Sequence, residues 1–252
     1  MHLIDTQAYA NRLRYVDPAL KAGLVLLVIL ICLGASQHAV NLTAIVWLLA
    51  IGVLWARLPV RLFLGLLATE GSFLLASAPG LLITVTYQAP GFQLGPFWFS
   101  ILPESLNIAA GVLSRALACA AAMNFLALTT PLVDLIDLAR RLRIPDLLID
   151  IMTLIYRFVF ALFDSLEQMR LAQESRLGYA NSQAAMRSAA LIASNLLIDT
   201  MRRSHRLQTA LEGRCYQGVL HVLQPTRQRP FKFFMVSFLL IASLLVSWSL
   251  SG

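Results

Sequence analysis

Long apolar segments dominate the first half of the chain and return once near its end. Five of them cover residues 20–34, 39–56, 62–86, 104–129 and 233–250. A helix that crosses a bilayer needs about 20 apolar residues. The pattern therefore predicts an all-α membrane bundle of about five spans. The first span is short, and the third, which contains Gly71, Pro79 and Gly80, is expected to be kinked or broken.

Between the fourth and fifth apolar segments the pattern changes to a helical repeat. Apolar residues recur on one helical face at Ile151, Leu154, Ile155, Phe158, Leu162, Leu166 and Met169. This helix should stop near Gly178. A second helix is predicted over residues 183–212, with an apolar stripe on one face and Asp199, Arg202, Arg203 and Arg206 on the other. Such long amphipathic helices either pack on each other and on the membrane face or form a docking platform for a soluble partner.

The distribution of positive charge predicts which regions face the cytoplasm. Most of the 20 Lys and Arg residues lie in the stretch 131–232, whereas residues 87–103 contain none and are rich in aromatic residues. By the positive-inside rule, the N-terminus lies inside, residues 87–103 lie outside, and the stretch after residue 130 is cytoplasmic. Residues 149–163 are apolar enough to suggest a further span. A crossing there would place the following arginines outside, so an interfacial helix is predicted instead.

These patterns predict four regions along the chain. They are a cytoplasmic N-terminal segment (1–19), a four-span bundle (20–129), a cytoplasmic region with the long amphipathic helices (130–229) and a last span (230–252).

The composition supports lipid as the principal surroundings of the chain. It is 58% hydrophobic and 13% charged, against about 25% charged residues in soluble domains. The net charge of +7 would suit nucleic acid or a membrane surface, but no nucleic-acid-binding motif accompanies it. Cys32, Cys119 and Cys215 follow neither a disulfide framework nor a zinc spacing. The first 17 residues do not have the pattern of a signal peptide.

The chain lacks the motifs of an enzyme. It has no phosphate-binding loop of the form G-x-x-x-x-G-K-[ST], no H-E-x-x-H and no G-x-S-x-G, so neither ATP binding nor catalysis is predicted for it. His2 stands next to the N-terminus, where a metal ligand is conceivable. A solvated cytoplasmic histidine is the favoured interpretation, and no metal site is predicted.

Two ionisable residues fall inside predicted spans. Glu70 and Arg115 are candidates for function because a charge in the bilayer is costly. The favoured interpretation is a structural ion pair between them, or an arginine bonded to backbone carbonyls. The alternative is a proton or substrate pathway, although no chain of polar groups continues across the membrane.

Several short sequences, in one order and on this topology, resemble a known family. They are Val16-Asp17-Pro18-Ala19-Leu20-Lys21, Thr129-Thr130-Pro131, Leu142-Arg143-Ile144-Pro145, Tyr156-Arg157-Phe158, Glu167-Gln168-Met169-Arg170, Glu174-Ser175-Arg176-Leu177-Gly178-Tyr179 and Glu212-Gly213-Arg214-Cys215-Tyr216-Gln217-Gly218. Together they resemble the transmembrane T component of energy-coupling factor (ECF) transporters, most closely the cobalt-type family, CbiQ.

The resemblance implies a coupling subunit of an ATP-driven importer in the bacterial cytoplasmic membrane. Its partners would be two ABC-type (CbiO-like) ATPases that bind ATP and Mg, a CbiM-like membrane subunit that binds cobalt, and a small CbiN-like subunit. The chain itself would hold no cofactor.

In the family, arginines of two Ala-Arg-Gly-like motifs enter grooves on the ATPases. The first motif maps to Ser175 and Arg176, with its glycine delayed to Gly178. The second maps to Gly213, Arg214 and Cys215, with alanine and glycine both replaced.

Three alternatives remain open at this stage. Nickel is a near alternative to cobalt as the transported ion. A stand-alone secondary transporter would show inverted repeats and polar helices at the midplane, which the sequence lacks. A membrane enzyme would need an acidic cluster, a histidine or a nucleophile at the interface, and none is present.

Overall fold

The computed structural model confirms an all-α membrane fold and describes residues 7–35, 37–82, 84–86, 92–94, 97–100, 103–216 and 231–251. The chain divides into two compact units. One comprises Met1–Asp134 with Pro225–Gly252, and the other comprises Leu135–Gln224. Each unit is described by itself below.

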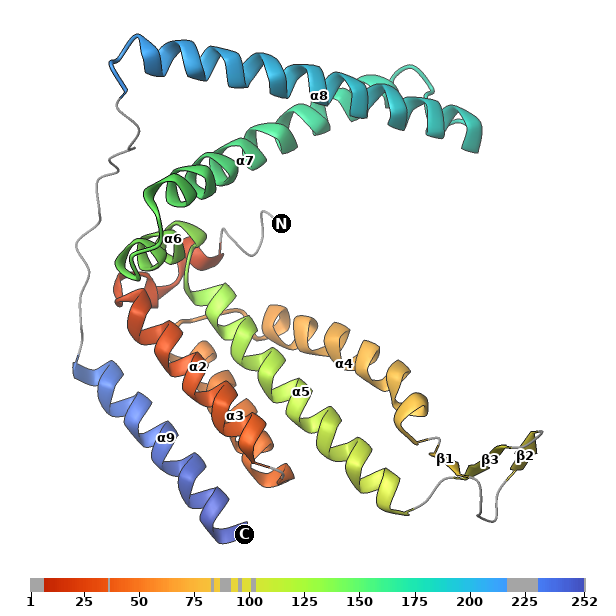
Figure 1. The fold of residues 1–252 in the computed structure, drawn as a ribbon, viewed down its shortest axis with the longest axis vertical. Helices are drawn as coiled ribbons and strands as arrows, with labels where there is room; N and C mark the ends of the chain where they lie inside the picture. The colour runs from red at the N-terminus through yellow and green to blue at the C-terminus, as the bar shows by residue number, and fades with distance from the viewer. Residues whose placement is uncertain are drawn as a thin grey trace. The chain divides into compact units, whose positions relative to one another are not determined.

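The first unit is a bundle built around one central helix. Its helices are α2 (Pro18–Gly34), α3 (His38–Ala50), α4 (Val60–Leu82), α5 (Pro103–Thr129) and α9 (Phe231–Ser251). A short 3-10 helix, η1 (Arg12–Tyr15), precedes α2, and a π-helical turn, η2 (Ile51–Trp55), extends α3. Helix α5 packs against α2, α3 and α4, while α9 packs mainly against α3 (Figure 1). Fully buried apolar side chains, Val28, Leu48, Phe125 and Leu240 among them, form the core of this bundle.

The bundle contains the predicted spans. In the part of the chain that the structure describes, four helices are long and apolar enough to cross a membrane: His38–Trp55, Val60–Gly80, Leu106–Thr129 and Phe231–Ser249. Helix α2 is apolar but shorter, as its sequence predicted. It begins where the side chain of Asp17 accepts a hydrogen bond from Ala19 N–H, with Pro18 in its first turn. Helix α4 continues through Gly71 and Pro79 to Leu82, so of the two expectations for this span, kinked or broken, the break does not occur.

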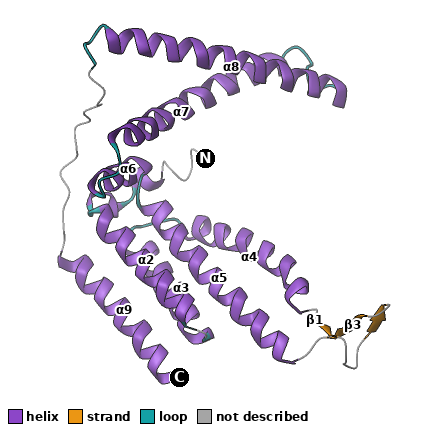
Figure 2. Cartoon of the chain, in the orientation of Figure 1, coloured by secondary structure: helices purple, strands orange, loops and turns teal. Residues whose placement is uncertain are grey.

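Two features of the bundle were not predicted. Lys21, in the first turn of α2, is fully buried, and its ammonium group donates to the carbonyl of Thr129, 2.8 Å away. A small antiparallel sheet of β1 (Thr84–Thr86), β2 (Phe92–Leu94) and β3 (Phe97–Ser100) lies between α4 and α5 (Figure 2). β3 is the central strand, and Phe99 is opposite both Val85 and Phe92. The β-branched and aromatic residues of this stretch favour extended backbone.

The second unit consists mainly of two long helices. Helix α6 (Leu132–Arg141) contains the boundary between the units, and α7 (Asp146–Glu174) and α8 (Ser182–Glu212) follow it. We call α7, α8 and their connection the hairpin. Helix α8 begins one residue from its predicted start and ends at the predicted residue, and Asn181 caps it by accepting from Ala184 N–H at 2.7 Å. Helix α7 ends four residues before Gly178. Among the described helices, it is not one of those long and apolar enough to cross a membrane.

A polar contact joins the two helices of the hairpin near its middle. Arg203 donates to the Asp199 carboxylate at 2.9 Å and to the Ser165 hydroxyl at 2.7 Å, and Ser165 also lies 3.2 Å from Asp199. Asp199 and Arg203, which were predicted on the face opposite the apolar stripe of this helix, therefore face α7. The reason is that Ser165 supplies a polar partner within the otherwise apolar repeat of α7.

Candidate functional site

The end of α7 is a tight left-handed turn that contains Arg176. Gly178 N–H donates to the Gln173 carbonyl at 2.8 Å, and Leu177 N–H donates to the Glu174 carbonyl at 3.0 Å. This pair of bonds defines a Schellman motif, in which the residue with positive φ is Leu177, at 57°. Arg176 immediately precedes that residue and is exposed.

The end of α8 has the same construction around Arg214. Tyr216 N–H donates to the Leu211 carbonyl and Cys215 N–H to the Glu212 carbonyl, both at 3.0 Å. Cys215 has a φ of 56° and follows the exposed Arg214. Arg176 and Arg214 thus occupy equivalent positions in two equivalent turns. In the described part of the chain, neither guanidinium forms an ion pair, so both are available to a partner.

The backbone at both turns has the conformation that the glycine of an Ala-Arg-Gly pattern would favour. The residue after each arginine has a left-handed backbone conformation, with positive φ. This conformation costs a residue with a side chain about 1–2 kcal/mol, whereas glycine adopts it readily. This chain keeps the turn with Leu177 and Cys215 in place of glycine. Gly213, before the second arginine, has a right-handed helical backbone with a φ of −64°. Ser175, before the first arginine, is the C-cap of α7.

Gly178 has a different role from the glycine of the motif. Its carbonyl accepts from the Ser188 hydroxyl at 2.9 Å, and a Cβ here would collide with Ser188 Oγ and lie 2.9 Å from the Gln173 carbonyl. The absence of a side chain therefore lets the connection pack closely against α8.

A hydrogen bond from Tyr216 joins the turn around Arg214 to the beginning of α7. Its hydroxyl donates to Asp150 Oδ2 at 2.9 Å, and Asp150 is 4% exposed. Desolvation raises the pKa of Tyr216, and the hydrogen bond to Asp150 raises it further. The pair of Tyr216 and Asp150 was not predicted from the sequence. The available signal was a tyrosine two residues after Arg214. The turn at the end of α8 reverses the chain there, so this side chain can reach α7.

The two arginine turns lie at opposite ends of α8. The first is at the connection between α7 and α8, where Ser188 meets Gly178, and the second is at the open end, where Tyr216 meets Asp150. Helix α8 has 31 residues, which at 1.5 Å per residue separates its ends by roughly 45 Å. The structure therefore brings Ser175, Arg176 and Gly178 together at one end, and Gly213, Arg214 and Cys215 at the other.

The two intramembrane residues do not pair with each other. Glu70 on α4 accepts from the Asn124 amide of α5 at 3.0 Å and 2.9 Å through its two carboxylate oxygens. Arg115 donates to the backbone carbonyl of Ala35 at 3.4 Å. Among the described residues no ion pair joins Glu70 and Arg115, so that alternative is wrong, while the bond from the arginine to a carbonyl was anticipated. Asn124 was missed because an amide in a span carries no formal charge.

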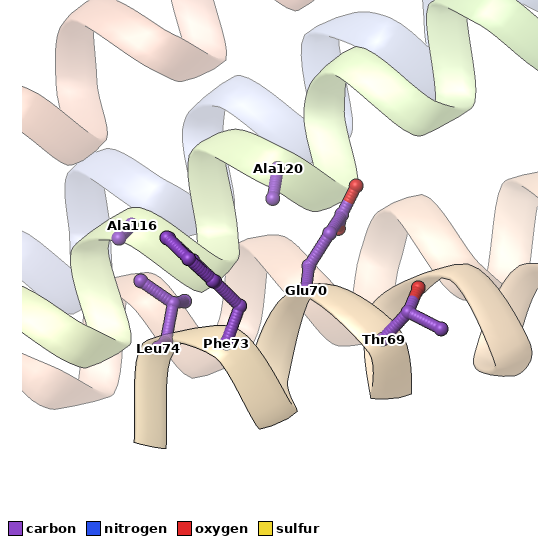
Figure 3. A pocket seen from close by; sticks show the side chains of 6 residues that line it. All are labelled: Thr69, Glu70, Phe73, Leu74, Ala116 and Ala120. Carbon is purple, nitrogen blue, oxygen red and sulfur yellow. The ribbon is translucent and has the colours of Figure 1, made fainter. Parts of the chain in front are cut away.

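Glu70 lines an open cavity of about 470 Å³ between α4 and α5, which we call the α4–α5 groove. Its walls are Thr69, Glu70, Phe73, Leu74, Ala116 and Ala120 (Figure 3). Polar atoms are few in this groove, and the Glu70 carboxylate is the single ionisable group among its lining residues.

The described residues contain no group of three or more His, Cys, Asp or Glu side chains that could hold a metal ion. His2 lies outside the described residues. Cys32, Cys119 and Cys215 are free cysteines.

Comparison with known proteins identifies the family. A family model described as CbiQ, cobalt transport protein, matches residues 10–226. The chain belongs to the CbiQ family. The resemblance found in the short sequences is thereby confirmed.

Relatives in the CbiQ family come from bacteria and archaea. The cobalt transport protein CbiQ of Rhodobacter capsulatus is 36% identical over 80% of this chain and 78% of its own length. An uncharacterized protein of Methanocaldococcus jannaschii is 33% identical over 93% of this chain and 88% of its own. A putative fused cobalt transport protein CbiMQ of Methanocorpusculum labreanum is 29% identical over 97% of this chain and 43% of its own.

Family membership and the apolar helices together define the protein as a multi-pass membrane protein. It is a transmembrane component of a cobalt transport system, in a family whose members are generally non-catalytic transporter subunits.

Proposed function

We propose that this protein is the coupling subunit of an ATP-driven ECF-type cobalt importer. It would transmit conformational change from two ATPase subunits to a separate substrate-binding membrane subunit. The observation that carries the proposal is the pair of equivalent turns that present Arg176 and Arg214 at opposite ends of α8.

The chemistry of the two turns suits docking into acidic grooves. Both guanidinium groups are exposed and, within the described residues, form no ion pair. A guanidinium stays charged and offers a planar fork of donors to a carboxylate, whereas an ammonium is a point charge. Two copies of one turn match two ATPase subunits that present the same groove.

The hairpin has the rigidity that a lever requires. Hydrogen bonds join its two helices at three places. Ser188 bonds to Gly178 at the connection, Arg203 and Asp199 bond to Ser165 in the middle, and Tyr216 bonds to Asp150 at the open end. A displacement at either arginine would therefore move the hairpin as one body.

The partners follow from the same proposal. CbiO-like ATPases would bind ATP and Mg, a CbiM-like subunit would bind cobalt, and a small CbiN-like subunit would be a further partner; the fused CbiMQ relative supports a CbiM-like partner. This chain would hold no cofactor. Nickel uptake is the alternative use of the same role. The chain would lie in the bacterial cytoplasmic membrane with its N-terminus inside and the hairpin in the cytoplasm.

Alanine substitution of the two arginines tests the coupling role. Losing one charge-assisted interface contact commonly costs about 2–5 kcal/mol. Arg176→Ala and Arg214→Ala should each reduce co-purification of ATPase subunits and cobalt uptake by cells, and the double variant should be worse. Lysine at either position should rescue only in part.

Arg187→Ala is the matched control, because Arg187 is an exposed arginine of α8 outside both turns. It should behave as wild type. Full complex formation and full uptake by the double alanine variant would show that the two turns do not couple the ATPases.

A further inference from the structure

The α4–α5 groove combines a charged group with an apolar surface. Asn124 donates to both Glu70 carboxylate oxygens, yet a carboxylate has about four acceptor positions, so this one amide leaves part of its capacity unused. Glu70 is half-buried, and its carboxylate extends from α4 toward α5 (Figure 3). Asp and Glu in a span are costly toward lipid and generally face protein or water.

The α5 side of the groove allows a helix to approach closely. Ala116 and Ala120 are four residues apart and both line it, and Asn124 continues the same face one turn further. Small residues at four-residue spacing let helix backbones come together in membranes. On the α4 side, the ring of Phe73 is 75% exposed and forms an apolar wall.

We propose that the α4–α5 groove docks a transmembrane helix of the substrate-binding membrane subunit, and that this helix presents an N–H or O–H donor to Glu70. The inference rests on the proposed function, which supplies a second membrane subunit. The donor follows from charge complementarity with the carboxylate, and the helical form follows from the small-residue face.

Two other occupants fit the groove less well. Acyl chains of lipid would leave the remaining acceptor capacity of Glu70 unmet. A second copy of this chain, docked symmetrically through the same groove, would place Glu70 against Glu70 and bring like charges together.

The test is made on the complete complex, co-expressed from its own CbiM-like and CbiO-like subunits. Glu70→Gln removes the charge and keeps the shape, and Ala120→Leu fills the groove. Both should lower recovery of the CbiM-like subunit, Glu70→Gln by about 3- to 20-fold, the range of interhelical hydrogen bonds in membranes. Recovery of the ATPase subunits should stay at the wild-type level, which also shows that the variants are folded.

Ala127→Leu is the matched control, because Ala127 is an exposed alanine of α5 outside the groove. It should retain both kinds of partner. Full recovery of the CbiM-like subunit with Glu70→Gln and Ala120→Leu would overturn the inference.

A photo-crosslinking benzophenone residue in place of Phe73 gives an independent measurement. Crosslinks to the CbiM-like subunit support the inference, whereas crosslinks only to lipid or only to a second copy overturn it. Failure of the proposed function has a different signature, because the wild-type chain would then recover no ATPase subunits at all.

Discussion

The bundle and the hairpin bury different kinds of side chain. In the bundle, α5 turns Ala118, Ala121, Ala122 and Phe125 inward, and each of these is fully buried. In α7 and α8, the buried apolar residues among those described are Ile149 and Ile192, while Asp150, Ser165 and Ser188 are buried as well. Several large apolar side chains of the hairpin stay exposed, Leu197 at 63% and Met201 at 58% among them.

This difference indicates how each unit is stabilised. The bundle is held by close packing of apolar side chains, and this interaction is non-directional. The hairpin has little apolar core, and directional hydrogen bonds set its geometry at three points along its length. A unit of this kind keeps a defined shape while leaving apolar surface for partners.

The largest expected effect is a core truncation in the bundle. Phe125→Ala removes a fully buried ring from α5 and should destabilise the bundle by about 3–5 kcal/mol, because a cavity remains. Thermal unfolding in detergent measures it. Met123→Ala, at a position of the same helix that is 55% exposed, is the control and should change little. Equal losses from the two variants would show that apolar packing does not hold the bundle.

A smaller effect is expected from one hydroxyl of the hairpin. Tyr216→Phe removes the donor to the buried Asp150 carboxylate and should free the end of α8. Hydrogen exchange should become faster at residues 211–216 and remain unchanged in the bundle. Tyr179→Phe is the matched control, since Tyr179 has nearly the same exposure, 40% against 39%. If hydrogen exchange at residues 211–216 were unchanged in Tyr216→Phe, the bond to Asp150 would not hold the end of α8 in place.

The contact at the middle of the hairpin should depend on pH. The hydrogen bond from Arg203 is the main cause that lowers the pKa of Asp199. A carboxyl group whose pKa is lower in the folded state stabilises that state above its unfolded pKa, about 3.9, and the stabilisation is lost as pH falls through the folded value. Exchange protection of α7 and α8, corrected for intrinsic rates, should therefore fall below about pH 4. Asp199→Asn should remove this part of the pH dependence, and an identical pH profile in that variant would contradict the assignment.

The smallest expected effect is a gain in stability at the two arginine turns. Leu177→Gly and Cys215→Gly place glycine at left-handed positions and should each stabilise the hairpin by about 0.5–1 kcal/mol, less than the strain relieved because glycine is more flexible when unfolded. Urea unfolding followed by exchange at residues 170–216 measures the gain. Leu177→Ala keeps a Cβ in the left-handed turn and should give none. Destabilisation by both glycine variants would mean that the side chains of Leu177 and Cys215 contribute more than their strain costs.

Local patterns in the sequence were sufficient to predict where the helices lie. Apolar length located α5 and α9, and the 3.6-residue repeat located α8 to within one residue at its start. Both signals act within a few turns of chain, so neighbours along the sequence carry them. The short sheet between α4 and α5 was missed because β1 continues the apolar run that was assigned to the third span, and because β1 pairs with β3, which lies 12 to 16 positions further along the chain.

The sequence by itself determined the number of apolar helices, the amphipathic pair and the candidate arginines. Tertiary structure decided which polar groups meet. It paired Glu70 with Asn124 and not with Arg115, buried Lys21 against Thr129, and turned Asp199 toward Ser165. Helical periodicity assigns a residue to a face but does not say which neighbour covers that face. A polar group in a low-dielectric interior takes whichever partner the packing brings within hydrogen-bond distance, and only the assembled helices set those distances.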